Sequence, residues 1–302
     1  MKVSVVVSAY NEEKKLEDCL KSVKDVASEI VVIDNTSSDK TSQIAKKYTD
    51  KVFMRENNVM LNVNKNFGFT KVTGKWILNL DADERVTDEL SKEILDLDEN
   101  MSTNGLLIPR KNILFGKWIR HSIWWPDYQL RLFKKNKGKF EEKHVHELLT
   151  LEGEAEKLMA PIEHLNYQTI SQYLYKLEHI YTESEVENII KSNKKLGWHD
   201  ALRMPAQDFM KTYFFQQGYK DGLHGLVLSL LQAFYMVVVF AKVWEKQGFE
   251  EKEISLDEIS DEFGALGKET YYWILTEKIN RGKSPIKKII NKIKRKAAKI
   301  HK

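Results

Sequence analysis

Short apolar runs alternate with amphipathic segments along the first third of the chain. The β-branched run 3–7 has the pattern of a strand buried on both faces, and runs 30–33 and 76–80 repeat that pattern. Between these runs, residues 12–27 and 62–71 place apolar side chains at helical spacing. Strands that alternate with helices are typical of βαβ units. The sequence therefore predicts an α/β domain with a largely parallel sheet flanked by helices.

Beyond residue 171 the pattern becomes helical. Residues 226–241 form a dense apolar segment of 16 residues that Ser229 and Gln232 interrupt. A membrane-spanning helix needs about 20 consecutive apolar residues, so we expect a buried or dimer-forming helix there and a possible homodimer. The predicted organisation is an α/β domain, a helical accessory region and a basic amphipathic tail, at residues 1–165, 166–280 and 281–302.

Composition and cysteine usage are those of an ordinary globular protein. Hydrophobic residues make up 42% and charged residues 30% of the 302 positions. The single cysteine, Cys19, excludes a disulfide within the chain and is expected to be a small core residue. The chain opens directly with a strand-like run, so we expect no signal peptide and a cytoplasmic location.

The positive charge is concentrated at the end of the chain. Residues 281–302 hold ten Lys/Arg and no Asp or Glu, and without them the net charge of +4 would become −6. A basic end on an acidic body favours docking to an anionic surface over nucleic-acid binding. Isoleucines recur on one face of a helix that begins at Pro285, and they predict peripheral attachment to an anionic membrane, at the inner face of the plasma membrane. The alternative is a solvated, disordered basic end.

The strongest signal for chemistry follows run 76–80. Asp81 and Asp83 are separated by one residue, so they point to the same side of an extended segment. Two such carboxylates can hold a hard divalent cation, Mn²⁺ or Mg²⁺, and leave coordination positions for substrate phosphates. Asp34 ends another buried strand, and ligands of such sheets bind beyond the carboxyl ends of the strands. A simple capping turn is the alternative for the acidic pair.

Three segments in this order resemble the markers of family 2 inverting glycosyltransferases, which have the GT-A fold. They are Ser4-Val-Val-Val-Ser-Ala-Tyr-Asn-Glu-Glu13, Ile30-Val-Val-Ile-Asp34 and Leu78-Asn-Leu-Asp-Ala-Asp83. The resemblance covers roughly residues 1–110. Segments 127–133 and 145–147 are similar to a bacterial subgroup that includes lipopolysaccharide core glucosyltransferases. The resemblance implies transfer of a sugar from a nucleotide-diphosphate donor, with uracil as the expected base, to a lipopolysaccharide-core or other lipid-linked acceptor.

The same resemblance implies roles for individual side chains. The metal ligands would be Asp81 and Asp83, with Asp83 the firmer of the two. Asp34 would accept a hydrogen bond from the base, although it could instead cap the short helix after its loop. Glu12 would lie near the ribose, or could simply favour a helix N-terminus. The nucleotide-binding set is Ala9, Tyr10, Glu12, Asp34, Lys65, Asp81 and Arg131, with the Arg131 fork on the diphosphate.

The catalytic base is less clearly marked. The Gly-rich segment with Glu-Asp that supplies the base in many family members is missing, and so is the Gln-x-x-Arg-Trp motif of processive synthases. The second absence indicates that one sugar is added. We expect Glu147 to be the base and Asp127 to be the alternative, although Glu147 could be a surface carboxylate. Further candidates are His146 and His164 for metal or phosphate, and Trp118, Trp124 and Trp125 for stacking on an acceptor sugar or for packing in the core.

Two other classes of protein use similar features. A nucleotidyltransferase has a related sheet and paired acids, but its first loop is normally rich in Gly and carries Arg or Lys. Here residues 8–12 contain neither. A non-catalytic membrane-docking relative would not need the retained acids Asp34, Asp81, Asp83 and Glu147.

Overall fold

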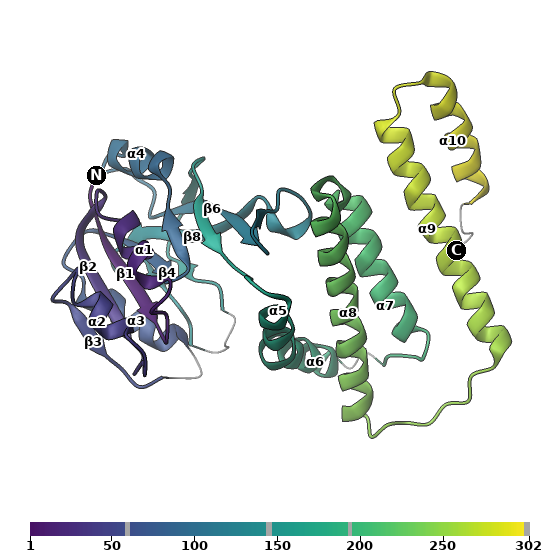
Figure 1. Cartoon of the computed structure of the whole chain (residues 1–302), viewed down its shortest axis with the longest axis horizontal. Coiled ribbons are helices and arrows are strands. Elements are labelled where there is room, and N and C mark those ends of the chain that lie inside the picture. Colours follow the sequence, from purple (N-terminus) through teal and green to yellow (C-terminus); the bar gives the residue numbers. More distant parts are fainter. Residues whose placement is uncertain (58–60, 143–146, 193–194, 299–302) are drawn as a thin grey trace. The chain divides into compact units, whose positions relative to one another are not determined.

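The computed structural model describes residues 1–57, 61–142, 147–192 and 195–298. The chain divides into two compact units (Figure 1). The first unit comprises Met1–Trp118 and Trp124–Asn166, and the second comprises Ile119–Ile123 and Tyr167–Lys302. The first is an α/β unit and the second is helical.

The α/β unit is built on one large mixed sheet. Its strand order is β3-β2-β1-β4-β8-β6-β12-β5. The first four strands in that order run parallel, whereas β8 is antiparallel to both β4 and β6. The predicted α/β fold with a mostly parallel sheet is thus confirmed. The strands in this order are Val52–Met54, Ala27–Asp34, Val3–Ala9, Trp76–Asp81, Asp127–Lys134, Gly105–Leu114, Ile162–Leu165 and Glu84–Val86.

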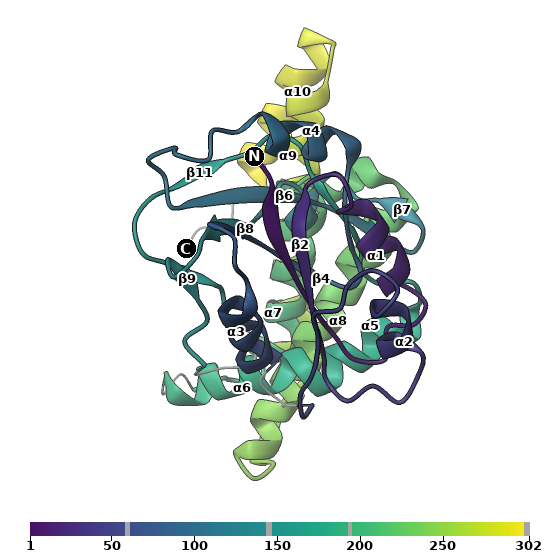
Figure 2. The same ribbon diagram turned by 90° about the vertical axis from the view of Figure 1, so that its left-hand side faces the viewer.

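Helices cover both faces of this sheet (Figure 2). On one face α1 (Leu16–Ser22) joins the larger core cluster, which includes the fully buried Cys19, as predicted. On the other face α3 (Leu61–Lys71) joins a second cluster. A Cβ on Gly68 of α3 would lie 2.6 Å from Cγ1 of Val6, so only glycine lets this helix approach β1 so closely.

The first helix is shorter than its sequence pattern predicted. The pattern ran over residues 12–27, but α1 ends at Ser22 and β2 already begins at Ala27. Residues 27–29 instead pair with β1, and Glu29 is opposite Ser4. The Glu29 carboxylate accepts a hydrogen bond from the Ser4 hydroxyl at 2.5 Å. Pairing with a neighbouring strand overrides the local helical spacing.

Helix α4 begins after a capping threonine. Helix α4 spans Asp88–Asp96, and the Thr87 hydroxyl accepts the amide of Leu90 at 3.2 Å. The remaining short elements of the unit are α2 (Thr41–Ala45) and the strands β7, β9, β10 and β11 at Lys117–Trp118, Gly138–Lys139, Thr150–Leu151 and Ala155–Lys157.

The second unit confirms the predicted C-terminal helical region. A one-turn 3₁₀ segment at 218–221 precedes α8, and Gly222 caps that helix with a positive φ of 66°. Pro285 is the first residue of α10, as predicted. The helices α5 to α10 span Ile170–Lys176, Thr182–Lys191, Asp200–Phe209, Leu223–Lys246, Leu256–Arg281 and Pro285–Ala297.

Helix α8 is packed on one side only. Gly225, Leu228 and Val239 are buried, while Leu223 and Leu230 are more than half exposed. The helix therefore is not the fully buried one that its apolar sequence allowed, and a role in dimer formation stays a prediction. Its 24 residues are long and apolar enough to cross a membrane, a test that many core helices of soluble proteins also pass.

Candidate active site

Asp81 lies at the carboxyl end of β4, where two cations hold its two oxygens. The Lys65 ammonium of α3 lies 2.5 Å from Oδ1, and Nη2 of Arg131 on β8 lies 2.7 Å from Oδ2. Burial would raise the pKa of Asp81, but these two cations outweigh it and hold the pKa well below its usual range. Asp81 is therefore a fixed carboxylate whose charge is already balanced.

A β-bulge aims Arg131 at this carboxylate. Leu106 of β6 pairs with Leu132, and the next residue, Leu107, pairs with Leu130, so Arg131 is the extra residue between them. Its side chain is buried, with Nη2 also 2.5 Å from Oε1 of Glu84. The structure thus gives Arg131 an internal role in positioning Asp81, whereas its predicted contact with a diphosphate stays a prediction.

Glu84 completes the buried charge cluster, and the sequence did not single it out. It is fully buried, and its Oε2 accepts the amide of Asp81 at 3.0 Å. Nη1 of Arg110 lies 4.0 Å from the other oxygen. The sequence signal for Glu84 was its position directly after Asp81 and Asp83. No motif in the sequence marks Arg110, on β6, as part of this cluster.

Asp83 faces a histidine across the site. Its Oδ1 lies 3.7 Å from Nε2 of His164 on β12, and its Oδ2 lies 3.8 Å from Nζ of Lys15. The other ring nitrogen of His164 lies 2.7 Å from Oδ1 of Asn112, which fixes the ring. Burial lowers the pKa of His164 more than the nearby carboxylates raise it, so the imidazole is neutral.

Asp83 and His164 supply some, but not all, of the ligands that a divalent cation needs. Within the described ranges no group of three or more His, Cys, Asp or Glu side chains forms a closed metal site. Asp83 and the neutral His164 nevertheless offer an oxygen and a nitrogen donor close together, beside Asp81. An open pair of this kind suits an ion that takes its other ligands from water and substrate phosphates. His146, the other predicted histidine, lies outside the described residues.

Asp34 keeps one carboxylate oxygen without a protein partner. Its Oδ1 accepts the amide of Ser37 at 2.9 Å, whereas the buried Oδ2 has no hydrogen-bond partner among the described residues. Buried polar atoms are rarely left so, which makes this oxygen a natural acceptor for a ligand N–H. The capping alternative is wrong, because α2 begins at Thr41 and Asp39 accepts the Thr41 amide at 2.9 Å.

The loop after β1 is tied to the loop after β2. The Asn11 carboxamide accepts the amide of Ser38 at 2.8 Å, and the Glu12 amide donates to the Thr41 hydroxyl at 2.8 Å. Tyr10 is 45% exposed at the edge of this double loop, while Ala9 is buried. The structure therefore brings the predicted nucleoside-binding residues to the same end of the sheet as Asp34.

A network of amides that the sequence did not reveal links these strand ends. Nδ2 of Asn35 donates to the Ser8 hydroxyl at 3.0 Å, and Nδ2 of Asn64 on α3 donates to Oδ1 of Asn35 at 2.7 Å. Single asparagines and serines are too common in loops to mark a site. Their mutual contacts fix the ends of β1 and β2 relative to α3.

The two candidate bases differ in how they are held. Oδ2 of Asp127 lies 2.5 Å from Nη2 of Arg110, and its Oδ1 accepts a hydrogen bond from Nε2 of Gln129 at 2.7 Å. Burial would raise the pKa of Asp127, but Arg110 and the hydrogen bonds lower it overall. Glu147, between β9 and β10, accepts the amide of Glu142 at 2.7 Å. An arginine-bound carboxylate is a weak proton acceptor, which counts against Asp127, and the role of Glu147 as the base stays a prediction.

Two of the three predicted stacking tryptophans contact each other. Trp118 and Trp125 meet edge to face with ring centroids 5.4 Å apart. Trp124 lies in a short 3₁₀ turn, and its carbonyl accepts Nδ2 of Asn112 at 2.9 Å. Packing accounts for the Trp118–Trp125 contact, and stacking on an acceptor sugar stays a prediction.

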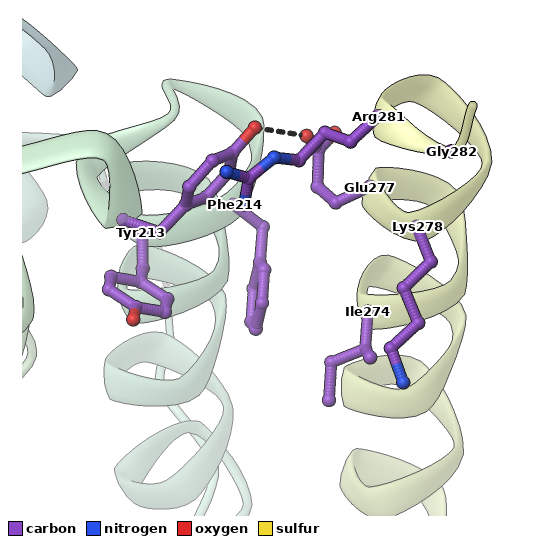
Figure 3. A pocket seen from close by; sticks show the side chains of 8 residues that line it. Tyr213, Phe214, Ile274, Glu277, Lys278, Arg281 and Gly282 are labelled. Carbon is purple, nitrogen blue, oxygen red and sulfur yellow. Dashed lines mark hydrogen bonds between the residues drawn. The ribbon is translucent and has the colours of Figure 1, made fainter. Parts of the chain in front are cut away.

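A cleft of about 450 Å³ lies within the helical unit, and none of the described residues predicted to bind nucleotide or metal or to act in catalysis lines it (Figure 3). One wall carries the aromatic residues Tyr213, Phe214 and Tyr219, and the other is the end of α9. The Tyr219 hydroxyl donates to Glu277 at 2.5 Å, and the Arg281 guanidinium lies 4.6 Å from the Tyr219 ring centroid.

Comparison with known proteins places this site in a family. Residues 4–149 match the family described as Glycosyl transferase family 2. The chain is 25% identical over 253 residues to the lipopolysaccharide core biosynthesis glycosyltransferase LpsC of Rhizobium meliloti, covering 81% of this chain and 92% of LpsC. It is 27% identical over 256 residues to an uncharacterized glycosyltransferase of Rickettsia bellii, covering 81% of this chain and 86% of the relative.

Solved structures show a weaker likeness. The crystal structure of residues 1–349 of Staphylococcus aureus TarS with UDP-GlcNAc matches 96% of this chain and 89% of that one, with 17% identity and a TM-score of 0.45. The matched family segment 4–149 carries Asp34 and Asp81 on the ends of β2 and β4, and Asp83 in the turn that follows β4. Residues 4–149 of this chain are thus a glycosyltransferase family 2 segment.

Proposed function

We propose that this glycosyltransferase moves a single sugar, with inversion, from a UDP-sugar to a hydroxyl of a lipopolysaccharide-core or other lipid-linked glycan. The observation that carries the proposal is the placement of Asp34 and Asp81 on the two strands that flank β1. Asp34 is opposite Ala9, and Asp81 is opposite Ser8. Neighbouring strands are about 4.8 Å apart, so the two acids are separated by about 10 Å, a span that suits a nucleoside diphosphate.

Each end of that span has the chemistry for one part of the donor. The free Oδ2 of Asp34 would accept the ring N–H of uracil, with the exposed Tyr10 beside it. Asp81, held by Lys65 and Arg131, would accept hydrogen bonds from the ribose hydroxyls and lie between the ribose and the metal ion. Lys65 is the cation closest to Asp81, so it would shift toward the diphosphate when the donor binds.

Asp83 and His164 would hold Mn²⁺ or Mg²⁺ next to the diphosphate. The bound ion supplies positive charge that stabilises the departing nucleoside diphosphate. Asn112 keeps the ring of His164 in place, and burial keeps that ring neutral, the form that can bind a cation.

Glu147 would take the proton of the acceptor hydroxyl as its oxygen attacks the anomeric carbon. The attack breaks the bond from that carbon to the phosphate oxygen, and the electron pair leaves with the diphosphate. A carboxylate suits this task if it lies within hydrogen-bond reach of the acceptor. The acceptor class rests on the likeness to LpsC, whose name refers to lipopolysaccharide core biosynthesis.

Nucleotide release from a panel of sugar nucleotides tests the donor. We expect release from one or a few UDP-sugars, with a requirement for Mn²⁺ or Mg²⁺. Thermal unfolding with UDP separates the alternatives, since ligands that bind the folded state raise its stability. Stabilisation that needs Mn²⁺ supports the proposal, a preference for nucleoside triphosphates would indicate a nucleotidyltransferase, and no response to either would indicate a non-catalytic relative.

A further inference from the structure

Helix α10 packs against the protein with its polar side. Lys288, Asn291 and Arg295, at spacings of three and four residues, are its half-buried residues. Nη1 of Arg295 donates to the Thr276 hydroxyl of α9 at 3.3 Å, and its guanidinium lies 5.5 Å from the Tyr272 ring centroid. The two helices form a hairpin in which α10 folds back along α9 (Figure 1).

The apolar side of the same helix is left exposed. Ile286, Ile289, Ile290 and Ile293 are 70%, 58%, 45% and 66% exposed. A surface helix of a soluble protein normally does the reverse, burying its apolar stripe and exposing its polar residues. Burial of apolar side chains is the dominant favourable term in folding, so four isoleucines left exposed on a single face add little to stability unless something covers them.

The charges around these isoleucines indicate what covers them. Helix α10 contains six Lys/Arg and no acidic residue, and the sequence from 281 to 302 contains no acid at all. Two copies of such a surface would repel each other, whereas an anionic lipid surface complements both its charge and its apolar stripe. The helical unit as a whole has a related character: with these four isoleucines it carries 21 of the 26 large hydrophobic residues that are exposed in the described structure.

We propose that the α9–α10 hairpin is a preformed docking surface for an anionic phospholipid bilayer. The isoleucines enter the boundary between headgroups and acyl chains, and the flanking lysines contact lipid phosphates. Because Arg295 already fixes α10 on α9, the helix does not have to fold when it reaches the membrane. The hairpin makes the protein peripheral, and this inference does not depend on which sugar is transferred.

The cleft of Figure 3 carries two further cations, Lys278 and Arg281, and one acid, Glu277, whose carboxylate accepts a hydrogen bond from the Tyr219 hydroxyl. It lies where α9 passes into the linker to α10, and Lys278, Arg281 and Gly282 line it. Arg281 is held over the Tyr219 ring, so its guanidinium is oriented before any ligand arrives. A headgroup phosphate beside Lys278 and Arg281 would add a contact that a free amphipathic peptide could not make.

Binding of the full chain to vesicles tests the proposal. Vesicles of phosphatidylcholine with and without phosphatidylglycerol are sedimented with the wild type and with Ile289→Ser/Ile293→Ser. We expect wild-type binding to the anionic vesicles only, and a loss of roughly tenfold or more in the double variant. The matched control is Ile170→Ser/Ile190→Ser, two isoleucines exposed on other helices, which should bind like the wild type.

Circular dichroism tests whether the surface is preformed. The helix content of the wild type should stay constant when anionic vesicles are added, and Arg295→Ala should bind more weakly and gain helix on binding. A rise in wild-type helix content would contradict a preformed hairpin. Equal vesicle binding by wild type and Ile289→Ser/Ile293→Ser would overturn the proposal. Loss of a dimer in that variant, without vesicle binding by the wild type, would instead assign the face to a second copy of the chain.

Discussion

The ammonium of Lys65 lies 2.5 Å from Oδ1 of Asp81, so the first acid of the strand-end pair is already bound to a cation. Nη2 of Arg131 donates a hydrogen bond to the second oxygen of Asp81, Oδ2, at 2.7 Å. Among the described residues the charged partners of Asp83 are, in contrast, at longer distances, 3.8 Å to Lys15 and 3.7 Å to His164. The two acids are therefore unequal: Asp81 is fixed by the protein, and Asp83 is the one available to a metal ion.

Asp83→Asn should abolish sugar transfer and leave the fold intact. The amide keeps the shape of the side chain but removes the negative charge that would attract the divalent cation. Nucleotide release in Mn²⁺ or Mg²⁺ measures the effect, with thermal unfolding as a check on folding. Asp96→Asn, the same change at an exposed position of α4, serves as control. Near-wild-type turnover of Asp83→Asn would remove Asp83 from the metal site.

Arg131→Met should lower the free energy of unfolding by about 3 to 5 kcal/mol. It leaves the fully buried Glu84 without its closest cation, and an uncompensated buried charge is expensive. Urea unfolding measures the loss, and Arg131→Lys should recover part of it. If Arg131→Met unfolded like the wild type but no longer bound UDP, Arg131 would be a diphosphate contact instead of a positioning residue.

Glu147→Gln should slow transfer by roughly two to four orders of magnitude, the usual contribution of a general base. The affinity for UDP should change little, because the base acts on the acceptor. Glu154→Gln, an exposed acid on the same part of the chain, is the control. Asp127→Asn should mainly reduce stability, since it breaks the contact with Arg110. A normal rate for Glu147→Gln together with a lost rate for Asp127→Asn would exchange the two roles.

Glu29 should make the fold sensitive to acid. Burial would raise the pKa of Glu29, but Lys51, Ser4 and the amides of Thr73 and Gly74 lower it to about 2, from an ordinary value of 4.5. Because the folded-state pKa is depressed, its contribution of about 2 kcal/mol is present above pH 4.5 and is lost as the pH falls toward 2.

Denaturant unfolding at several pH values checks this contribution. Glu29→Gln should be less stable than the wild type at neutral pH, and the difference should shrink between pH 4.5 and 2. Glu17→Gln removes a carboxylate from an exposed pair with Lys21 and should change stability little. A difference between Glu29→Gln and the wild type that stays constant with pH would show that charge is not its cause.

The sequence alone was enough to predict the parallel part of the sheet and the carboxyl ends of two of its strands. Runs such as 3–7 and 76–80 are too apolar to lie anywhere but in a buried sheet, and Asp34 and Asp81 end two of its strands. The cap at Thr87 and the start of α10 at Pro285 were also predictable, because they depend on contacts within a few residues.

Only the tertiary structure decided how the polar groups are paired. The bulge at Arg131 pairs residues that are 23 to 26 positions apart. The contact of Arg131 with Glu84 and that of His164 with Asp83 join residues 47 and 81 positions apart. The end of α1 at Ser22 and the outward isoleucines of α10 likewise depend on which neighbours each segment meets. Periodicity in a sequence records which residues prefer burial, but the partner that satisfies a charge or covers an apolar face is chosen by folding in three dimensions.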